Sequence, residues 1–254
     1  MVLARPQYRN AQSAQLLEEI DDALTAAERD RSVKVIVLSG EGDAFSSGHD
    51  LGTPEQAAWK EEHLAGAATD VEGSFVYSWD HFLAMSLRWR DIPKPTIAMV
   101  HGWCIFGGWL VASSMDLIVA ADDARFMTAL LQYFPLPYDV GPRKAKELLF
   151  DNAEIGASRA LELGFVNKVV PRAQLEDETL AMAERIASNS AFYLRMVKAS
   201  VNNAQDAMGF RTAVTGAHAH YHLSEVSNRQ WARKQGSDPE PRKRMPLVQK
   251  LLDQ

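Results

Sequence analysis

Near its start the chain carries apolar residues at helical spacing, and further on it carries short, nearly continuous apolar runs. Five apolar residues between Ser13 and Asp30 recur every three or four positions: Leu16, Leu17, Ile20, Leu24 and Ala27. This spacing predicts an amphipathic helix that lies on a core. The runs 33–39, 96–100 and 117–121 are typical of buried parallel strands. Because helical patterns separate the strands, we predict an α/β fold with right-handed crossovers.

Downstream of Phe126 the pattern becomes irregular and then helical. Pro135, Pro137 and Pro142 follow one another closely and exclude a regular helix there. Helical spacing returns and predicts four helices, over 143–150, 158–163, 174–188 and 192–205. The polar segment 52–73 has no clear period, so we expect a mobile loop or a loose helix that could act as a lid over one end of the sheet.

Composition and charge narrow the classes of protein that fit this pattern. The 254 residues are 46% hydrophobic and 24% charged, which is typical of a globular chain with one large domain and a C-terminal extension. A formal charge of −6 argues against a nucleic-acid binder, which needs a basic face. Cys104 is the only cysteine, so we expect neither an intrachain disulfide nor a cysteine-based zinc site. Since we find no signal sequence and no apolar run near the ~20 residues of a membrane span, we expect a cytoplasmic protein.

Two glycine-containing turns each follow a predicted strand, at 44–51 (AFSSGHDL) and 101–109 (HGWCIFGGW). If Gly107 and Gly108 begin a helix, their N–H groups lack intrahelical acceptors and lie at the positive end of the helix dipole. An N–H from the first turn, aimed at the same point, would complete an oxyanion hole in which each donor contributes roughly 3 kcal/mol. The alternative is that the glycines only permit tight turns and close packing. Neither turn matches the dinucleotide or Walker phosphate motifs.

Several motifs in a fixed order give the sequence a more specific resemblance. It resembles the enoyl-CoA hydratase/isomerase, or crotonase, superfamily in RPQYRNA (5–11), AFSSGHDL (44–51), KPTIAMVHGWCIFGGW (94–109), DLIVAADDARF (116–126) and ALELGFVNKVVP (160–171). The resemblance implies a curled ββα spiral core, here residues 1–190 with an incomplete first hairpin. It also implies a C-terminal helical region, residues 191–254, that helps to form a homotrimer or a dimer of trimers.

The resemblance also implies a chemistry. Members of the superfamily bind acyl-CoA and stabilise a thioester enolate, with CoA as part of the substrate and no other cofactor. By their place in the motifs, the backbone N–H groups of His49 and Gly107 are the implied oxyanion donors. The backbone of His49, Asp50, Leu51 and Gly52 is the implied substrate contact. For the Asp50 side chain, a structural role that holds the turn is the alternative to a catalytic one.

Two glutamates that act as acid and base in typical hydratases align with Leu110 and Leu130. Leucine cannot transfer a proton, and losing positioned acid–base catalysis lowers rates by roughly 10²- to 10⁴-fold. Tyr138 and Asp139 are the nearest candidate replacements, in a Pro-Tyr-Asp turn that resembles one in methylmalonyl-CoA decarboxylase. Decarboxylation generates an enolate without a base, which makes it an alternative to hydration. A packed Tyr138 and a turn-capping Asp139 are the structural alternatives.

Other interpretations of single residues stay open. A serine hydrolase could use Ser113 or Ser114 with His49 and Asp50, and a chain without catalysis could serve as a CoA-binding partner. Of His218, His220 and His222 only the first and last share a helical face, so we expect no metal site. Four aromatic residues could line an acyl pocket or make core or trimer contacts (Trp89, Trp103, Phe106, Trp109). Three basic residues could bind CoA phosphates or belong to a solvated tail (Arg242, Lys243, Arg244).

Overall fold

The computed structural model of the chain describes residues 1–64, 70–128, 131–152 and 154–236. Its first sheet has five parallel strands in the order β1 (Val2–Leu3), β2 (Ile36–Gly40), β4 (Thr96–Val100), β6 (Leu117–Ala121) and β9 (Lys168–Val170). The three strands predicted from apolar runs are confirmed. Strand β2 begins later than its run, because the N–H of Val33 still closes a turn on the carbonyl of Asp30.

A second sheet contains β3 (Ala44–Ser46), β5 (Trp103–Ile105), β7 (Arg125–Met127) and β8 (Ile155–Gly156), with β8 antiparallel to β7. Strands β2, β4 and β6 of the first sheet are each followed along the chain by a strand of the second sheet, β3, β5 and β7 respectively. Repeated strand–strand–helix units coil the chain, so the predicted ββα spiral is confirmed.

The first long helix, α1 (Ala14–Arg29), forms where the apolar spacing predicts it. The Ser13 hydroxyl accepts a hydrogen bond from the N–H of Leu16 at 3.2 Å and caps the helix. Leu16, Leu17, Ile20 and Leu24 are buried, while Ala27 packs at the edge of the core. The cap and the apolar face together fix where this helix begins and which side faces the sheets.

The polar segment 52–73 contains the whole of α2 (Pro54–Leu64) and the start of α3 (Val71–Ser78); residues 65–69 lie outside the described part. We expected either a mobile loop or a loose helix in this segment. For residues 54–64 the helix is correct and the loop is wrong. Tertiary contacts explain this, because the buried Gln56 side chain accepts a hydrogen bond from the N–H of Ala14 at 2.8 Å. Helix α3 continues through the π-helix η3 (Trp79–Ala84) into α4 (Met85–Asp91).

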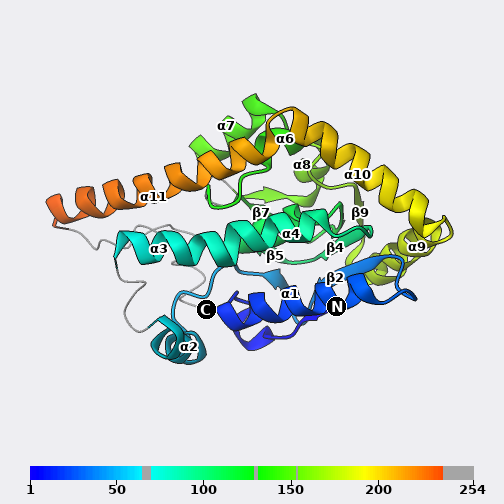
Figure 1. Cartoon of the computed structure of the whole chain (residues 1–254), viewed down its shortest axis with the longest axis horizontal. Helices are drawn as coiled ribbons and strands as arrows, with labels where there is room; N and C mark the ends of the chain where they lie inside the picture. Colours follow the sequence, from blue (N-terminus) through cyan, green and yellow to red (C-terminus); the bar gives the residue numbers. More distant parts are fainter. Residues whose placement is uncertain (65–69, 129–130, 153, 237–254) are drawn as a thin grey trace.

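The C-terminal part is helical, as predicted, with α7 (Pro142–Asp151), α8 (Ala157–Glu162), α9 (Leu175–Ala187), α10 (Ala191–Ala207) and α11 (Phe210–Lys234). One short helix, α6 (Leu136–Asp139), forms in the proline-rich stretch because the first turn of a helix tolerates proline. Two 3₁₀ turns, η1 (Pro6–Tyr8) and η4 (Arg172–Gln174), also form. Helix α11 packs against α3 and η3 and extends beyond the sheets (Figure 1).

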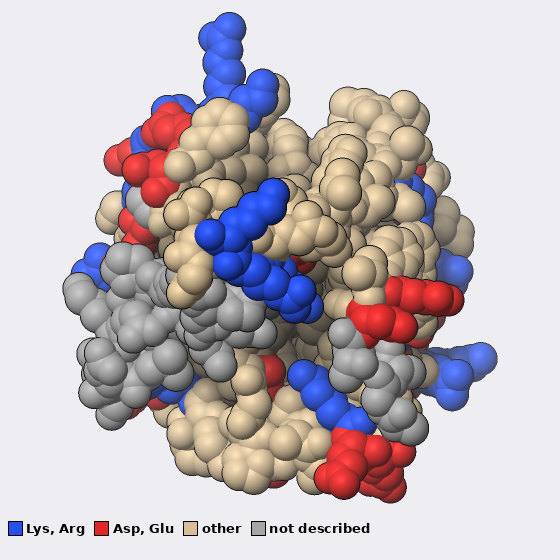
Figure 2. Space-filling view, turned by 90° about the vertical axis from the view of Figure 1, so that its left-hand side faces the viewer, with Lys and Arg blue, Asp and Glu red and all other residues tan. Residues whose placement is uncertain are grey.

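On the face shown in Figure 2, Lys and Arg side chains stand in separate groups, with acidic and uncharged side chains beside them. This face therefore carries charges of both signs. Within the described ranges, none of the helices combines the length and apolar character needed to cross a bilayer.

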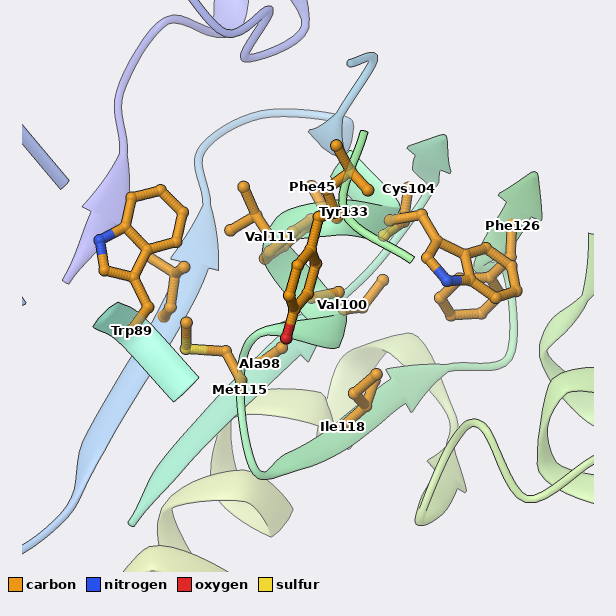
Figure 3. Close-up of a cluster of buried hydrophobic side chains, with 14 of the residues drawn as sticks. Phe45, Trp89, Ala98, Val100, Cys104, Val111, Met115, Ile118, Phe126 and Tyr133 are labelled. Carbon is orange, nitrogen blue, oxygen red and sulfur yellow. The ribbon is translucent and has the colours of Figure 1, made fainter. Parts of the chain in front are cut away.

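The main core packs the sheets against α1, α4 and α5 (Gly107–Ser113). Tyr133 lies beside Val111 in this core and directs its hydroxyl toward Met115 (Figure 3). Trp89 and Trp109 are 1% and 2% exposed, and Trp109 stacks on Phe165 with ring centroids 3.9 Å apart. The core interpretation is therefore correct for these two tryptophans, while Trp103 and Phe106 are only partly buried.

Candidate active site

The two glycine-containing turns lie against each other. Gly48 has φ +94°, and a Cβ atom added to it would lie 2.9 Å from Cβ of Phe106 and 3.1 Å from the backbone nitrogen of Gly107. A Cβ at Gly108 would lie 2.6 Å from the carbonyl oxygen of Ser46. Only glycine therefore permits this approach, which brings the peptide between Gly48 and His49 next to the N–H of Gly107.

Helix α5 begins at Gly107 with its N-terminus at this contact. The first intrahelical hydrogen bond joins the N–H of Leu110 to the carbonyl of Phe106 at 3.1 Å. The N–H groups of the residues before Leu110 consequently lack an intrahelical acceptor and lie at the positive end of the helix dipole. Phe106 has φ +50° and ψ −113°, a conformation that few L-residues adopt. A strained residue thus directs the chain into the helix.

The imidazole of His49 lies over Gly107. A Cβ at Gly107 would lie 2.7 Å from Nδ1 of His49 and 2.2 Å from Oε1 of Gln12. The ring stacks on Phe82 at 3.9 Å between centroids, and its Nε2 lies 2.8 Å from Oε1 of Gln132. When that oxygen accepts, Nε2 carries the proton. Side chains from two distant parts of the chain, Gln12 and His49, therefore lie against Gly107, and Phe82 and Gln132 contact the His49 ring.

Gln12 and Gln132 were missed in the sequence. Both side chains are buried, at 3% exposure each. Gln12 directly follows the RPQYRNA motif, and Gln132 is a polar residue inside the apolar stretch 130–136. A buried glutamine in such surroundings needs hydrogen-bond partners, so an isolated amide in an apolar run is the signal that points to Gln132.

Asp50 holds the turn that follows His49. Its carboxylate accepts hydrogen bonds from the N–H groups of Gly52 at 3.0 Å and Thr53 at 2.8 Å, and it pairs with Arg5 at 3.0 Å. Burial alone raises the pKa of Asp50, but the hydrogen bonds from Thr53, Gly52 and Arg5 outweigh it and lower the pKa overall. The Asp50 side chain thus holds the turn through these contacts. Leu51, half exposed, and Gly52 lie at the surface beside it.

Tyr138 and Asp139 have their contacts elsewhere. The Tyr138 hydroxyl donates to the carbonyl of Met208 at 3.4 Å, and its ring packs 5.1 Å from Phe210. Asp139 lines a cavity at the far end of α5, beside Ser113 and Ser114. The catalytic roles predicted for both residues stay predictions.

Leucines stand at the two positions, 110 and 130, where typical hydratases carry glutamates. Leu110 is 3% exposed and belongs to the core. It therefore presents an apolar side chain one turn into α5. Leu130 lies outside the described residues, as do Arg242, Lys243 and Arg244.

The hydrolase interpretation fails on geometry. The Ser114 hydroxyl donates to the carbonyl of Leu110 within its own helix at 2.8 Å, and Asp50 is engaged with Arg5. The His49 ring stacks on Phe82, and its Nε2 lies 2.8 Å from Oε1 of Gln132. These side chains form no nucleophile–base–acid series in the described part of the chain.

The histidines of α11 do not form a metal site. His218 and His222 are buried, with ring centroids 4.8 Å apart, and pack against Phe75 of α3. Burial lowers the pKa of His218 to about 4, so it is neutral at physiological pH. Among the described residues no group of three potential ligands comes together.

Comparisons with known proteins point to one family. The sequence profile described as "Enoyl-CoA hydratase/isomerase" matches residues 1–239. The candidate enoyl-CoA hydratase EchA13 of Mycobacterium tuberculosis is 36% identical over 248 residues, covering 91% of this chain and 77% of that protein.

Two crystal structures are similar over most of both chains. A probable enoyl-CoA hydratase of Mycobacterium smegmatis has 37% identity and a TM-score of 0.80, covering 89% of this chain and 90% of that one. An enoyl-CoA hydratase/isomerase of Xanthobacter autotrophicus Py2 has 32% identity and a TM-score of 0.79, covering 92% and 89%. With the spiral fold and the paired glycine turns, these matches show that the chain belongs to the enoyl-CoA hydratase/isomerase (crotonase) superfamily of acyl-CoA enzymes.

Proposed function

We propose that the backbone N–H groups of His49 and Gly107 form an oxyanion hole for the thioester carbonyl of an acyl-CoA. The observation that carries this proposal is the close approach of the Gly48–His49 peptide to the nitrogen of Gly107 at the start of α5. A carbonyl oxygen bound there gains negative charge as the enolate forms. Each preorganised donor stabilises that charge by roughly 3 kcal/mol.

The reaction that uses this enolate is of the hydratase type named in the relatives. Hydration adds water across the double bond and needs a group that delivers and removes protons. The buried Leu110 cannot do so. Water would then have to be positioned by other groups. The amide of Gln12 and the imidazole of His49 are the polar side chains next to Gly107, and the amide of Gln132 lies on the far nitrogen of that imidazole.

Decarboxylation is the second candidate, and Leu110 favours it. The bond between the α-carbon and the carboxylate breaks, its electron pair forms the enolate, and CO₂ leaves. Water then supplies a proton to the α-carbon. No base is needed to start this sequence, so an apolar side chain at position 110 does not impede it.

A panel of enoyl-CoA and carboxyacyl-CoA thioesters, analysed by mass spectrometry after incubation, distinguishes the candidates. A product heavier by one water supports hydration, and one lighter by CO₂ supports decarboxylation. Binding of the thioesters without any product supports a CoA-binding partner without catalysis. Absence of binding to every thioester in the panel contradicts the proposed function.

We also propose that the C-terminal region, residues 191–254, joins copies of the chain into a homotrimer or a dimer of trimers. Support comes from three apolar side chains of α10 that lie in solvent, Phe192, Tyr193 and Met196, which are 70%, 58% and 40% exposed. Exposed apolar patches of this kind mark interaction surfaces. Sedimentation velocity of the wild type and of Phe192→Glu tests this, because a charge at the interface should dissociate the assembly, whereas a monomeric wild type contradicts it.

A further inference from the structure

A cavity of about 380 Å³ lies at the opposite end of α5 from Gly107. Ser113 and Ser114 at the end of the helix line it, as do Pro95 before β4 and Leu117 at the start of β6. A helix of seven residues is about 10 Å long, so the cavity is separate from the contact between His49 and Gly107. Helix α10 forms the outer wall.

Three polar atoms that line this cavity are buried without a hydrogen-bond partner among the described residues. They are Oγ of Ser113, the hydroxyl of Tyr133 and Oδ2 of Asp139. The Tyr133 side chain is 1% exposed, and burial raises its pKa well above the ordinary value. Buried polar groups are normally satisfied, so three that face one space indicate something that binds between them.

The charges around the cavity leave one carboxylate uncompensated. Lys198 pairs with Asp116 at 2.8 Å, and Arg90 pairs with Asp91 and Asp206, both at 3.2 Å. Asp139 makes no ion pair with any described residue, and burial raises its pKa to about 7. A cation that entered the cavity would therefore gain a counter-charge that no described side chain occupies.

The rest of the lining is apolar and reaches the surface. Leu194, Val197 and Val201 of α10 line the cavity, as does Phe210 of α11. In the single chain Val197 and Val201 are 44% and 57% exposed, so the cavity opens beside the face of α10 that we propose as the contact between copies. A short aliphatic chain can lie along this wall while its polar end reaches the buried groups.

We propose that this cavity is a second ligand site, which binds a primary ammonium group carried on a short aliphatic chain. An ammonium has three N–H donors, and Asp139, Tyr133 and Ser113 offer three acceptors. The ionised carboxylate supplies the opposite charge. A carboxylate ligand would instead face an unpaired carboxylate, and a neutral alcohol would leave Asp139 uncompensated.

Isothermal titration with n-butylammonium, n-butanol and butyrate, in the absence of any acyl-CoA, tests this site. We expect n-butylammonium to bind at least about tenfold more tightly than n-butanol, which corresponds to about 1.4 kcal/mol, and we expect butyrate not to bind. Tighter binding of butyrate, equal binding of all three, or no heat with any of them overturns the proposal. Because no thioester is present, these outcomes are independent of the proposed enolate chemistry.

Two variants and a control assign the binding to the cavity. Asp139→Asn keeps the shape of the side chain, and we expect it to weaken n-butylammonium binding by about tenfold or more. Tyr133→Phe should weaken it by roughly fivefold, as expected for one hydrogen bond. Asp151→Asn, which removes an exposed carboxylate at the end of α7, should leave the affinity unchanged. Equal affinity of Asp139→Asn and wild type overturns the assignment even if Tyr133→Phe does not fold.

The pH dependence gives a further check on the sign of the charge. Ammonium binding needs ionised Asp139, so affinity should rise between pH 6 and pH 8, through its pKa of about 7. The other ionisable side chains in the lining are Arg90, Asp116, Tyr133 and Lys198. Burial raises the pKa of Tyr133 and lowers that of Lys198 against the opposing effect of Asp116. The rise should disappear in Asp139→Asn; a fall in affinity with pH contradicts an ammonium ligand.

Discussion

At its first residue α5 meets the His49 turn through backbone atoms, whereas its last turn faces a cavity whose lining includes the hydroxyls of Ser113 and Tyr133 and the carboxylate of Asp139. Glycines at both sides of the first contact permit the approach, and they fix N–H groups that do not titrate. The second group of polar atoms depends on side chains, one of which has a pKa of about 7. We therefore expect the N–H donors at the start of α5 to be independent of pH, and the charge of the cavity at its far end to change with pH.

The largest expected effect is at the first end. Gly107→Pro removes the N–H donor, although proline itself is tolerated at the first position of a helix. Gly107→Ala keeps the donor, and both variants add a Cβ close to the His49 ring. We expect kcat/KM of the proline variant to fall roughly 10²- to 10³-fold below that of the alanine variant. Circular dichroism confirms that both fold, and equal activity of the two would place the oxyanion donors elsewhere.

The second effect concerns stability at the other end. The folded-state pKa of Asp139 is raised from 3.8 to about 7, so the folded protein binds more protons than the unfolded chain between these values. Its stability therefore falls as pH rises toward 7. Between pH 5 and pH 8 the wild type should lose about 2–3 kcal/mol relative to Asp139→Asn, since one pKa unit corresponds to ~1.4 kcal/mol. Urea unfolding of both proteins at the two pH values measures this, and parallel stabilities would contradict the buried, unpaired carboxylate.

A third effect returns to the entry of α5. Phe106 at φ +50° and ψ −113° is a strained residue, and such conformations cost on the order of 1–3 kcal/mol for a side chain with a Cβ. Phe106→Ala removes the ring but keeps the Cβ, and Phe106→Gly removes both. We expect the glycine variant to be about 1–2 kcal/mol more stable than the alanine variant, opposite to the usual order in helices. Chemical denaturation decides this, and an alanine variant of equal or greater stability would show that the position is not strained.

The start of α5 and the cavity beyond its last turn also differ in how much of each can be predicted from the sequence. Helix α1, the strands at 96–100 and 117–121 and the glycine turns follow from local spacing and motifs, because each depends on neighbouring residues. The contact of Gln132 with His49 and the direction of Tyr133 depend on the path of the chain after β7, which three prolines make irregular. The cavity depends on how α10 packs, which no local pattern determines. The position of Asp139 in the sequence suggests a place near the missing glutamates, but its side chain lines the cavity at the far end of α5.

The smallest expected effect tests whether Gln132 positions His49. Gln132→Leu removes the acceptor 2.8 Å from Nε2 and so weakens one contact that orients the ring over Gly107. The loss of one such hydrogen bond is worth about 1 kcal/mol, so kcat/KM should fall roughly fivefold. Gln132→Glu retains an acceptor for Nε2–H and should restore most of the loss, with a pH profile that its carboxylate now shifts. If the leucine variant matched the wild type, contacts such as the stacking on Phe82 would hold the ring without Gln132, and the amide would serve only to satisfy a buried group.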